Sequence, residues 1–312
     1  MLLVVLCPVW IPLSAVTDLV RGRFRLPTTR LLAFGTGWAW LEMVGVLMAI
    51  GLWLTHRSGD IDAHYRIKRW WAGSLMRVLR ATTGISVDIT GMDAVEPGRA
   101  VVLSRHASLA DSLVSAWVFT GPAGKRTRYV LKKELESDPC LDIVGHRLPN
   151  HFLNRTANDS GAELDALRAL TAGNGGLGAG DVAVIFAEGT RSSPKKRDRA
   201  LVKIGERDPE RAARLSGLQH LIPPRPAGSR ALLQGDPNAD VVMAWHVGFD
   251  GLNDFAGILR HLARKPPPVR FAMRRITRAE VPVDDEATFE RWLDEIWLRM
   301  DADVHEMINS AS

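Results

Sequence analysis

From Gly84 onward, short apolar segments alternate with segments of helical spacing, and this alternation restricts the fold more than any other feature. Strands are predicted at residues 85–90, 100–103, 128–131, 151–154, 181–186, 240–247 and 269–276. Helices are predicted at residues 111–119, 158–171 and 285–308. Such alternation is typical of α/β proteins, in which helices cover a mostly buried sheet. We therefore expect an α/β fold with a sheet flanked by helices, and surface connections at 228–240 and 264–270.

Two apolar segments precede this region. Residues 1–17 contain no charged side chain, and residues 31–55 contain one, Glu42. The second segment is long enough to span a bilayer, whereas the first is marginal. A secretory signal peptide fits poorly, because the first segment lacks a basic start and a clear cleavage site. Two buried core helices are the alternative, but Trp38, Trp40 and Trp53 favour a membrane interface.

Basic side chains follow both apolar segments, so the positive-inside rule gives no clear orientation. A hairpin that enters the bilayer from one face would keep both basic segments near anionic headgroups. We therefore predict a membrane-associated hydrophobic hairpin over residues 1–58. An α/β domain should follow over 59–312, with its motif-bearing core at about 84–250. Residues 61–81 have the pattern of an amphipathic helix, which either faces the core or lies on the membrane surface.

Composition narrows the classes of function. The chain of 312 residues has a net charge of +5 and a pI near 9.5, which suits nucleic acid, anionic lipid or phosphorylated substrates. Most tryptophans lie in the N-terminal region rather than in a basic stripe, so we expect no nucleic-acid partner. The two cysteines, Cys7 and Cys140, form no paired motif. This argues against a disulfide framework and a cysteine zinc site.

A glycine-rich stretch, GNGGLG at 173–178, has the spacing of a dinucleotide-binding loop. It follows a predicted helix and leads into a strand, whereas a phosphate-binding loop leaves a strand and opens a helix. A turn is therefore the better interpretation. The chain contains neither a Walker loop nor a nucleophile elbow, which disfavours serine-hydrolase chemistry.

One polar motif follows a buried strand, in the stretch VVLSRHASLADSL at 101–113. His106 lies at the strand-to-helix junction, where functional groups of α/β folds tend to gather. Asp111 begins the next helix, from which a carboxylate can hold one imidazole tautomer and stabilise the imidazolium. The alternative is that Asp111 only caps the helix and His106 is an ordinary polar residue. The pair alone leaves both interpretations open.

A second polar motif lies in DVAVIFAEGTRSSPKKR at 181–197, where a strand ends in Glu188, Gly189, Thr190 and Arg191. Glycine lets the chain turn tightly and lets a ligand approach the backbone. The planar guanidinium of Arg191 suits phosphate, and three further basic residues at 195–197 add positive potential. A strand-end turn with a solvated basic loop is the alternative.

Together the two motifs resemble the 1-acyl-glycerol-3-phosphate acyltransferase family of glycerolipid acyltransferases. That family has His, four residues and Asp, followed by Phe-Pro-Glu-Gly-Thr-Arg. Here Ala187 replaces the proline, and Arg105 stands where asparagine usually precedes the histidine. Three weaker blocks occur in the family's order: YVLKKEL at 129–135, NHFLNR at 150–155 and HLIPPRPAGS at 220–229.

The resemblance implies a glycerolipid-acyltransferase-like fold, with a mixed sheet flanked by helices after the N-terminal hydrophobic hairpin. It also implies a reaction without metal or cofactor. The acyl chain would move from acyl-CoA or acyl-ACP to the hydroxyl of 1-acyl-glycerol-3-phosphate, giving phosphatidic acid. His106 would be the general base and Asp111 its orienting partner. Acceptor binding would involve a further set of residues, of which the three basic ones would contact the phosphate: Glu188, Gly189, Thr190, Arg191, Lys132 and Arg155.

The same resemblance implies a lysophospholipid acceptor, an acyl-CoA or acyl-carrier-protein donor and a bilayer as partners. It also implies a bacterial inner-membrane location with the catalytic domain on the cytoplasmic side. One alternative keeps acyl transfer but changes the acceptor to another lysophospholipid, a glycolipid or an amino-acid lipid. A second alternative is a non-catalytic lipid-binding protein of the same fold, which the altered neighbours Arg105 and Ala187 favour slightly.

Overall fold

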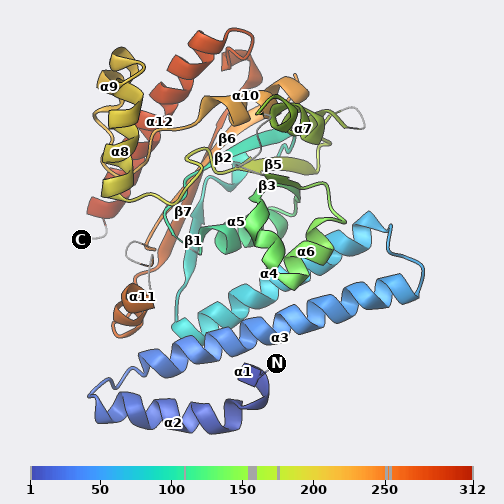
Figure 1. Cartoon of the computed structure of the whole chain (residues 1–312), viewed down its shortest axis with the longest axis vertical. Coiled ribbons are helices and arrows are strands. Elements are labelled where there is room, and N and C mark those ends of the chain that lie inside the picture. The colour runs from blue at the N-terminus through green and yellow to red at the C-terminus, as the bar shows by residue number, and fades with distance from the viewer. Residues whose placement is uncertain are drawn as a thin grey trace.

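The structure is a computed structural model that describes residues 2–108, 110–153, 160–173, 176–249, 252 and 255–310. Within these residues a seven-stranded sheet runs through the centre of the domain, with helices on both faces (Figure 1). The strands are β1 (Val87–Thr90), β2 (Ala100–Ser104), β3 (Arg126–Lys132), β4 (His151–Leu153), β5 (Asp181–Ile185), β6 (Asp240–Val247) and β7 (Val269–Ile276).

The strand order is β1-β7-β6-β2-β5-β3-β4. The five strands from β6 to β4 are parallel to one another, whereas β7 pairs antiparallel with β6 and parallel with β1. The sheet is therefore mixed, as predicted. Leu103 of β2 lies opposite Ile185 of β5 and Met243 of β6. Because these strands share one direction, the segments that follow them emerge at one edge of the sheet.

The sheet has an apolar core on each face. Successive side chains of a strand point to opposite faces, so Val101 and Leu103 belong to one cluster and Val102 belongs to the other. All three are fully buried, as the continuous apolar run VVL predicts for a central strand of a parallel sheet.

The helices are α1 (Leu2–Val5), α2 (Cys7–Val20), α3 (Pro27–Leu54), α4 (Ile61–Thr83), α5 (Asp111–Thr120), α6 (Pro139–Gly145), α7 (Ser160–Ala172), α8 (Pro194–Gly205), α9 (Pro209–Leu215), α10 (Pro226–Gly235), α11 (Phe255–Leu262) and α12 (Glu286–Asn309). Side chains of α7, α10 and α12 pack into the first core cluster. Side chains of α4 and α5 pack into the second.

The N-terminal helices α2 and α3 form an antiparallel pair (Figure 1). The buried carboxylate of Asp18 closes their turn, since its Oδ2 accepts hydrogen bonds from the amides of Thr28 and Thr29 at 2.9 and 3.1 Å. Within the described residues, α3 is the one helix long and apolar enough to cross a membrane. Only 17% of its most apolar window is buried, so α3 is not a core helix within this chain.

The pair is attached to the α/β domain through α3, which lies along α4 (Figure 1). Glu42, the only charged residue of the long apolar segment, makes part of this attachment. Its carboxylate accepts hydrogen bonds from Trp71 Nε1 on α4 at 2.9 Å and from the amide of Cys140 on α6 at 3.2 Å. The amphipathic helix α4 also buries Leu75 and Leu79. Of the two interpretations of residues 61–81, the core-facing helix is therefore correct.

All seven predicted strands are present, with boundaries that differ by a few residues. The prediction of a surface connection at 228–240 was wrong, because α10 covers most of it and buries Leu232 and Leu233. Gly235 ends α10 within contact of α7, where a Cβ would lie 2.2 Å from the Arg168 carbonyl oxygen. A loop-like composition thus arises from a close approach of two helices. The basic residues at 195–197 belong to helix α8 rather than to a loop.

Candidate active site

The first motif lies at the junction of β2 and α5, at the edge where the parallel strands end. His106 Nδ1 is 3.1 Å from Oδ2 of Asp111, the first residue of α5. This contact assigns the ring proton to Nδ1 and leaves Nε2 with its lone pair. No described residue hydrogen-bonds Nε2, and the side chain is 13% exposed. His106 therefore presents a basic nitrogen from a largely buried ring.

The Asp111 carboxylate is 1% exposed and organises the segment before its helix. Its Oδ2 accepts hydrogen bonds from the amides of Ala107 and Ser108, and its Oδ1 accepts one from the Ser108 hydroxyl. Burial opposes ionisation, but nearby His246 and the hydrogen bonds from His106 and Ser108 hold the pKa of Asp111 well below its usual range. Asp111 is therefore a carboxylate at neutral pH.

A second histidine lies on the other side of Asp111, and the sequence motifs did not identify it. His246 on β6 is 1% exposed, and its Nε2 is 3.1 Å from Asp111 Oδ1. Neither ring nitrogen has a hydrogen-bond partner among the described residues, and the contact with Asp111 is an ion pair when the imidazole is protonated. Phe249 and Phe271 enclose the ring, with centroid distances of 5.6 and 6.3 Å. The carboxylate thus lies between two imidazoles.

Glu188 of the second motif links its own segment to the backbones of two other segments. It is buried, and its Oε1 accepts a hydrogen bond from the amide of His106 at 2.8 Å. Its Oε2 accepts one from the amide of Ile222 at 3.2 Å. Burial raises the pKa of Glu188 to about 8, although these amides and the Arg105 guanidinium favour the charged form. Both oxygens are engaged by the chain itself, so Glu188 fixes the position of His106.

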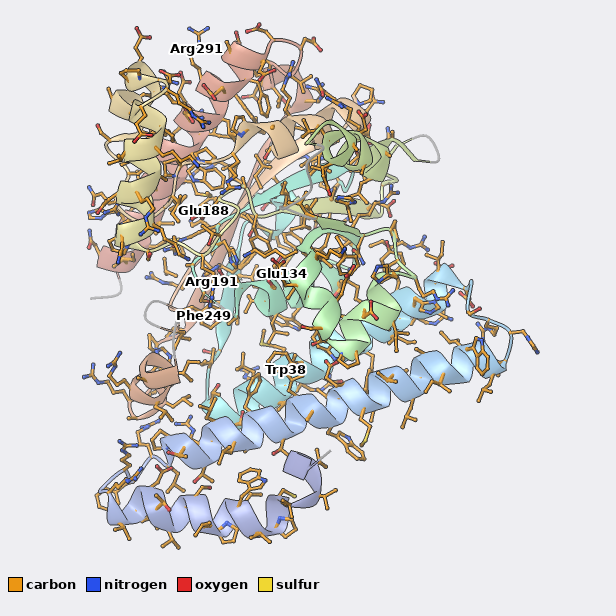
Figure 2. The ribbon with its side chains drawn as sticks, viewed as in Figure 1. Trp38, Glu134, Glu188, Arg191, Phe249 and Arg291 are labelled. Carbon is orange, nitrogen blue, oxygen red and sulfur yellow. The ribbon has the colours of Figure 1, made fainter. Side chains whose placement is uncertain are left out.

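The rest of the Glu-Gly-Thr-Arg segment turns over the same edge. Gly189 has φ +69°, and a Cβ there would lie 3.0 Å from Nε of Arg225. Lys196 Nζ donates to the Thr190 hydroxyl at 3.1 Å and to the Arg191 carbonyl at 3.0 Å. The Nη1 of Arg191 is buried and has no hydrogen-bond partner among the described residues. Figure 2 shows Arg191 below Glu188 in the central part of the molecule.

The proline-arginine block lies against this segment. The amide of Arg225 donates to the Ala187 carbonyl at 2.9 Å. The C-terminal helix α12 holds the start of the block, because Asp301 accepts hydrogen bonds from three consecutive amides, Gln219, His220 and Leu221, at 2.7 to 2.9 Å. The region after residue 240, which contains none of the sequence motifs, therefore supplies both His246 and the support of this block.

The predicted site residues separate into three groups. His106, Asp111 and the segment from Glu188 to Arg191 are brought together. Lys132 is the last residue of β3, at the same edge of the sheet. However, β5 lies between β3 and β2, so β3 is roughly 10 Å from the strand that leads to His106. Arg155 lies outside the described residues.

Arg105, which stands where the family usually has asparagine, has a structural role. It is buried, its amide donates to the Ala244 carbonyl at 2.9 Å, and its Nη1 donates to the His246 carbonyl. It therefore extends the β2–β6 pairing and supports the strand that carries His246. The amides of Ala107 and Ser108, which precede α5 in the chain, are already used by Asp111. They are not free to stabilise an oxyanion.

Residues 86–214 match the model of the acyltransferase family, described as Acyltransferase. This stretch contains both motifs, and the match confirms their resemblance to acyltransferases. Acyl transfer is therefore the class of reaction that this part of the chain supports.

Among solved structures, the chain is similar to one titled as the crystal structure of the 1-acyl-sn-glycerophosphate (LPA) acyltransferase, PlsC, from Thermotoga maritima. The identity is 13%, the alignment covers 86% of this chain and 95% of that chain, and the TM-score is 0.48. A comparison with curated proteins gave no match.

Proposed function

We propose that this protein transfers an acyl chain from acyl-CoA or acyl-ACP to the free hydroxyl of 1-acyl-glycerol-3-phosphate, giving phosphatidic acid. The observation that carries the proposal is the His106–Asp111 pair, whose Nε2 is unpaired among the described residues and lies beside the Glu-Gly-Thr-Arg segment. A base held in one tautomer by a buried carboxylate is what activation of a hydroxyl requires.

The reaction needs no covalent enzyme intermediate, because the thioester is already activated. His106 Nε2 takes the proton of the acceptor hydroxyl as the oxygen attacks the thioester carbonyl. The tetrahedral intermediate then collapses, the C–S bond breaks, and the imidazolium returns the proton to the leaving thiolate. Asp111 stabilises the imidazolium between these two steps.

Arg191 is the first candidate for the acceptor phosphate. Its buried Nη1 has no acceptor among the described residues, and a phosphate oxygen would supply one. Lys132 and Arg155 remain further candidates for this contact. Gly189 and Thr190 would line the acceptor site, whereas Glu188 acts by positioning His106 and the backbone around it.

The N-terminal pair of helices supports membrane attachment. Large apolar side chains of α2 and α3 are exposed, among them Val20 at 82% and Trp53 at 65%. A bilayer would cover them, and an amphiphilic acceptor could then enter from the membrane surface. We propose a bacterial inner-membrane location with the α/β domain on the cytoplasmic side, where acyl donors are available.

The test uses membranes that contain the wild-type chain, His106→Ala or His305→Ala. His305 is exposed on α12 and serves as the matched histidine control. Labelled acyl-CoA or acyl-ACP is supplied with lysophosphatidic acid, other lysophospholipids or monoacylglycerol, and products are identified by mass. Product should form from lysophosphatidic acid, and His106→Ala should lower its rate by about 10² to 10⁴ while His305→Ala does not.

Transfer to a different acceptor only would refute the phosphate assignments and keep the reaction class. Absence of transfer to every acceptor with both donors would refute the catalytic proposal and favour a lipid-binding protein. An active His106→Ala variant would show that another group is the base.

A further inference from the structure

A basic hollow of about 540 Å³ lies at α11, apart from the residues of the proposed active site. One wall is Gly248, the first residue after β6, and the others come from α11 and the segment that follows it. Among the residues that the structure describes, the lining is formed by Gly248, Gly257, Arg260, His261, Arg264, Lys265, Pro266 and Pro267. None of these described residues is acidic.

The cations of this hollow have no counter-charge in the described part of the chain. Arg260, Arg264 and Lys265 are exposed, and none of the three forms an ion pair with a described residue. Three like charges around one hollow repel each other, and an anion placed among them removes that repulsion. Nε2 of His261 is buried with no hydrogen-bond partner among the described residues, so one further polar atom of this lining is unsatisfied.

Arg30 fixes the hollow against the start of the long apolar helix α3. Its Nη1 donates to the carbonyl of Leu262, the last residue of α11, at 3.1 Å. Its Nε donates to the carbonyl of Thr82 at 2.8 Å, and its Nη2 donates to that of Thr83, both in the last turn of α4. Figure 1 shows α11 between the sheet and the turn that joins α2 to α3.

The turn that joins α2 to α3 carries both basic and apolar side chains on its surface. Arg21, Arg23 and Arg25 are exposed in the turn, and Phe24 between them is 80% exposed. Basic side chains beside exposed apolar ones match a membrane surface, where apolar groups enter the acyl region and cations meet phosphate headgroups.

We propose that the α11 hollow binds the phosphate headgroup of an anionic phospholipid in the bilayer surface. The inference rests on the membrane attachment in the proposed function and goes beyond it, because it assigns a lipid site to residues outside the acyltransferase motifs. A soluble phosphate ligand such as coenzyme A has the same charged chemistry. The neighbouring apolar helices favour the lipid, and the experiment distinguishes the two.

The experiment measures partition of the purified full chain onto vesicles by sedimentation, with no acyl donor present. One set of vesicles is phosphatidylcholine, and the other is phosphatidylcholine mixed with phosphatidylglycerol. The variant R260Q/R264Q/K265Q is compared with R199Q/K203Q/R207Q, which removes the same charge from exposed positions on or just after α8. Circular dichroism checks that both variants are folded, and a separate titration without vesicles measures their affinity for coenzyme A.

Each basic side chain near an anionic surface contributes about fivefold to partition. The α11 variant should therefore bind the mixed vesicles on the order of a hundredfold more weakly than the wild type. The α8 variant should change much less, and both variants should match the wild type on phosphatidylcholine alone.

An equal loss in both variants would mean that only net charge matters, and it would overturn the proposal. So would an α11 variant with wild-type partition, or a wild-type chain with no preference for the mixed vesicles. An α11 variant that loses affinity for coenzyme A while its vesicle binding is unchanged would assign the hollow to the donor and also overturn it. Because the readout is binding alone, a chain inactive on every lysolipid would refute the proposed reaction and leave this test intact.

Discussion

Asp111→Asn should separate the catalytic role of Asp111 from its structural role. In the wild type, Oδ2 accepts hydrogen bonds from the Ala107 and Ser108 amides and from His106 Nδ1. An asparagine that places its carbonyl oxygen at the Oδ2 position keeps these three contacts. Its amide group replaces Oδ1, which in the wild type contacts the Ser108 hydroxyl and His246 Nε2. The alanine variant loses these Oδ1 contacts as well, so the further cost of the asparagine in unfolding free energy is only about 1 kcal/mol, the loss of charge assistance at Oδ2.

Asp111→Ala removes both oxygens and leaves two buried amide donors without an acceptor. Each such donor costs about 1–3 kcal/mol, so the alanine variant should lose about 3 kcal/mol after some water enters the space. The two variants should then differ by about 2 kcal/mol. The unfolding entropy is about 2.1 cal/mol/K per residue, so one kcal/mol shifts the Tm of a chain of 312 residues by about 1.5 °C. The difference in Tm should therefore be about 3 °C.

Turnover should fall by about 10² to 10⁴ in both variants, because neither offers a negative charge to the imidazolium of His106. Unfolding in urea and acyl transfer on the same preparations test both statements. An asparagine variant as unstable as the alanine variant would refute the hydrogen-bond reasoning. An asparagine variant with wild-type turnover would refute the role of the charge.

Four further outcomes are expected. Gly189→Ala should cost about 1–2 kcal/mol of unfolding free energy, because a left-handed φ strains any residue with a Cβ, and turnover should fall with it; unchanged stability would contradict the strain. Arg191→Ala should raise the KM for lysophosphatidic acid but not for monoacylglycerol, and an equal rise for both acceptors would argue against phosphate binding. Asp301→Ala should lower stability by roughly 3 kcal/mol, since three amides lose their acceptor; urea unfolding measures it. The pKa of Glu188 is raised to about 8, so the contribution of this group to the unfolding free energy is complete below about pH 4.5 and is lost as the pH rises toward 8. The unfolding free energy of the wild type minus that of Glu188→Gln should therefore decline over this range, by at most about 1.4 kcal/mol per pH unit. A flat difference would show that the group does not titrate with this shift.

The sheet could be predicted because its strands carry their signal locally. A buried parallel strand needs a short run of apolar, mostly β-branched residues, as in VVL at 101–103, and glycine or polar residues mark its ends. The ends of those strands also identified His106 and the segment from Glu188 to Arg191. These predictions use only neighbours along the chain.

Helix α10 was missed because its composition is set by contact with α7. Gly235 and the polar residues around it have the pattern of a turn until the closeness of the Arg168 backbone is known. The only large apolar residues of α10 are Leu232 and Leu233, which are adjacent. The sequence therefore shows no apolar residues repeating at helical spacing.

His246 could not have been predicted as a site residue. It is one histidine in an apolar strand, and its contact with Asp111 depends on the pairing of β6 with β2, which lie about 140 residues apart in sequence. The same is true of Asp301, whose carboxylate meets three amides about 80 residues earlier. Glu188 was in the predicted site. Its burial and its positioning role could not be predicted, because they depend on contacts with residues distant in the sequence.

The dependence of the site on α12 has a consequence for the order in which the chain is made. The apolar helices α2 and α3 leave the ribosome long before His106, and His106 leaves it long before β6 and α12. Until α12 is present, the amides of residues 219–221 lack their acceptor, and the block that meets Glu188 has no support. A growing chain can therefore reach a membrane surface while the site is still incomplete. Activity should begin only after the last helix has docked, and a chain shortened to the matched stretch at 86–214 should be inactive.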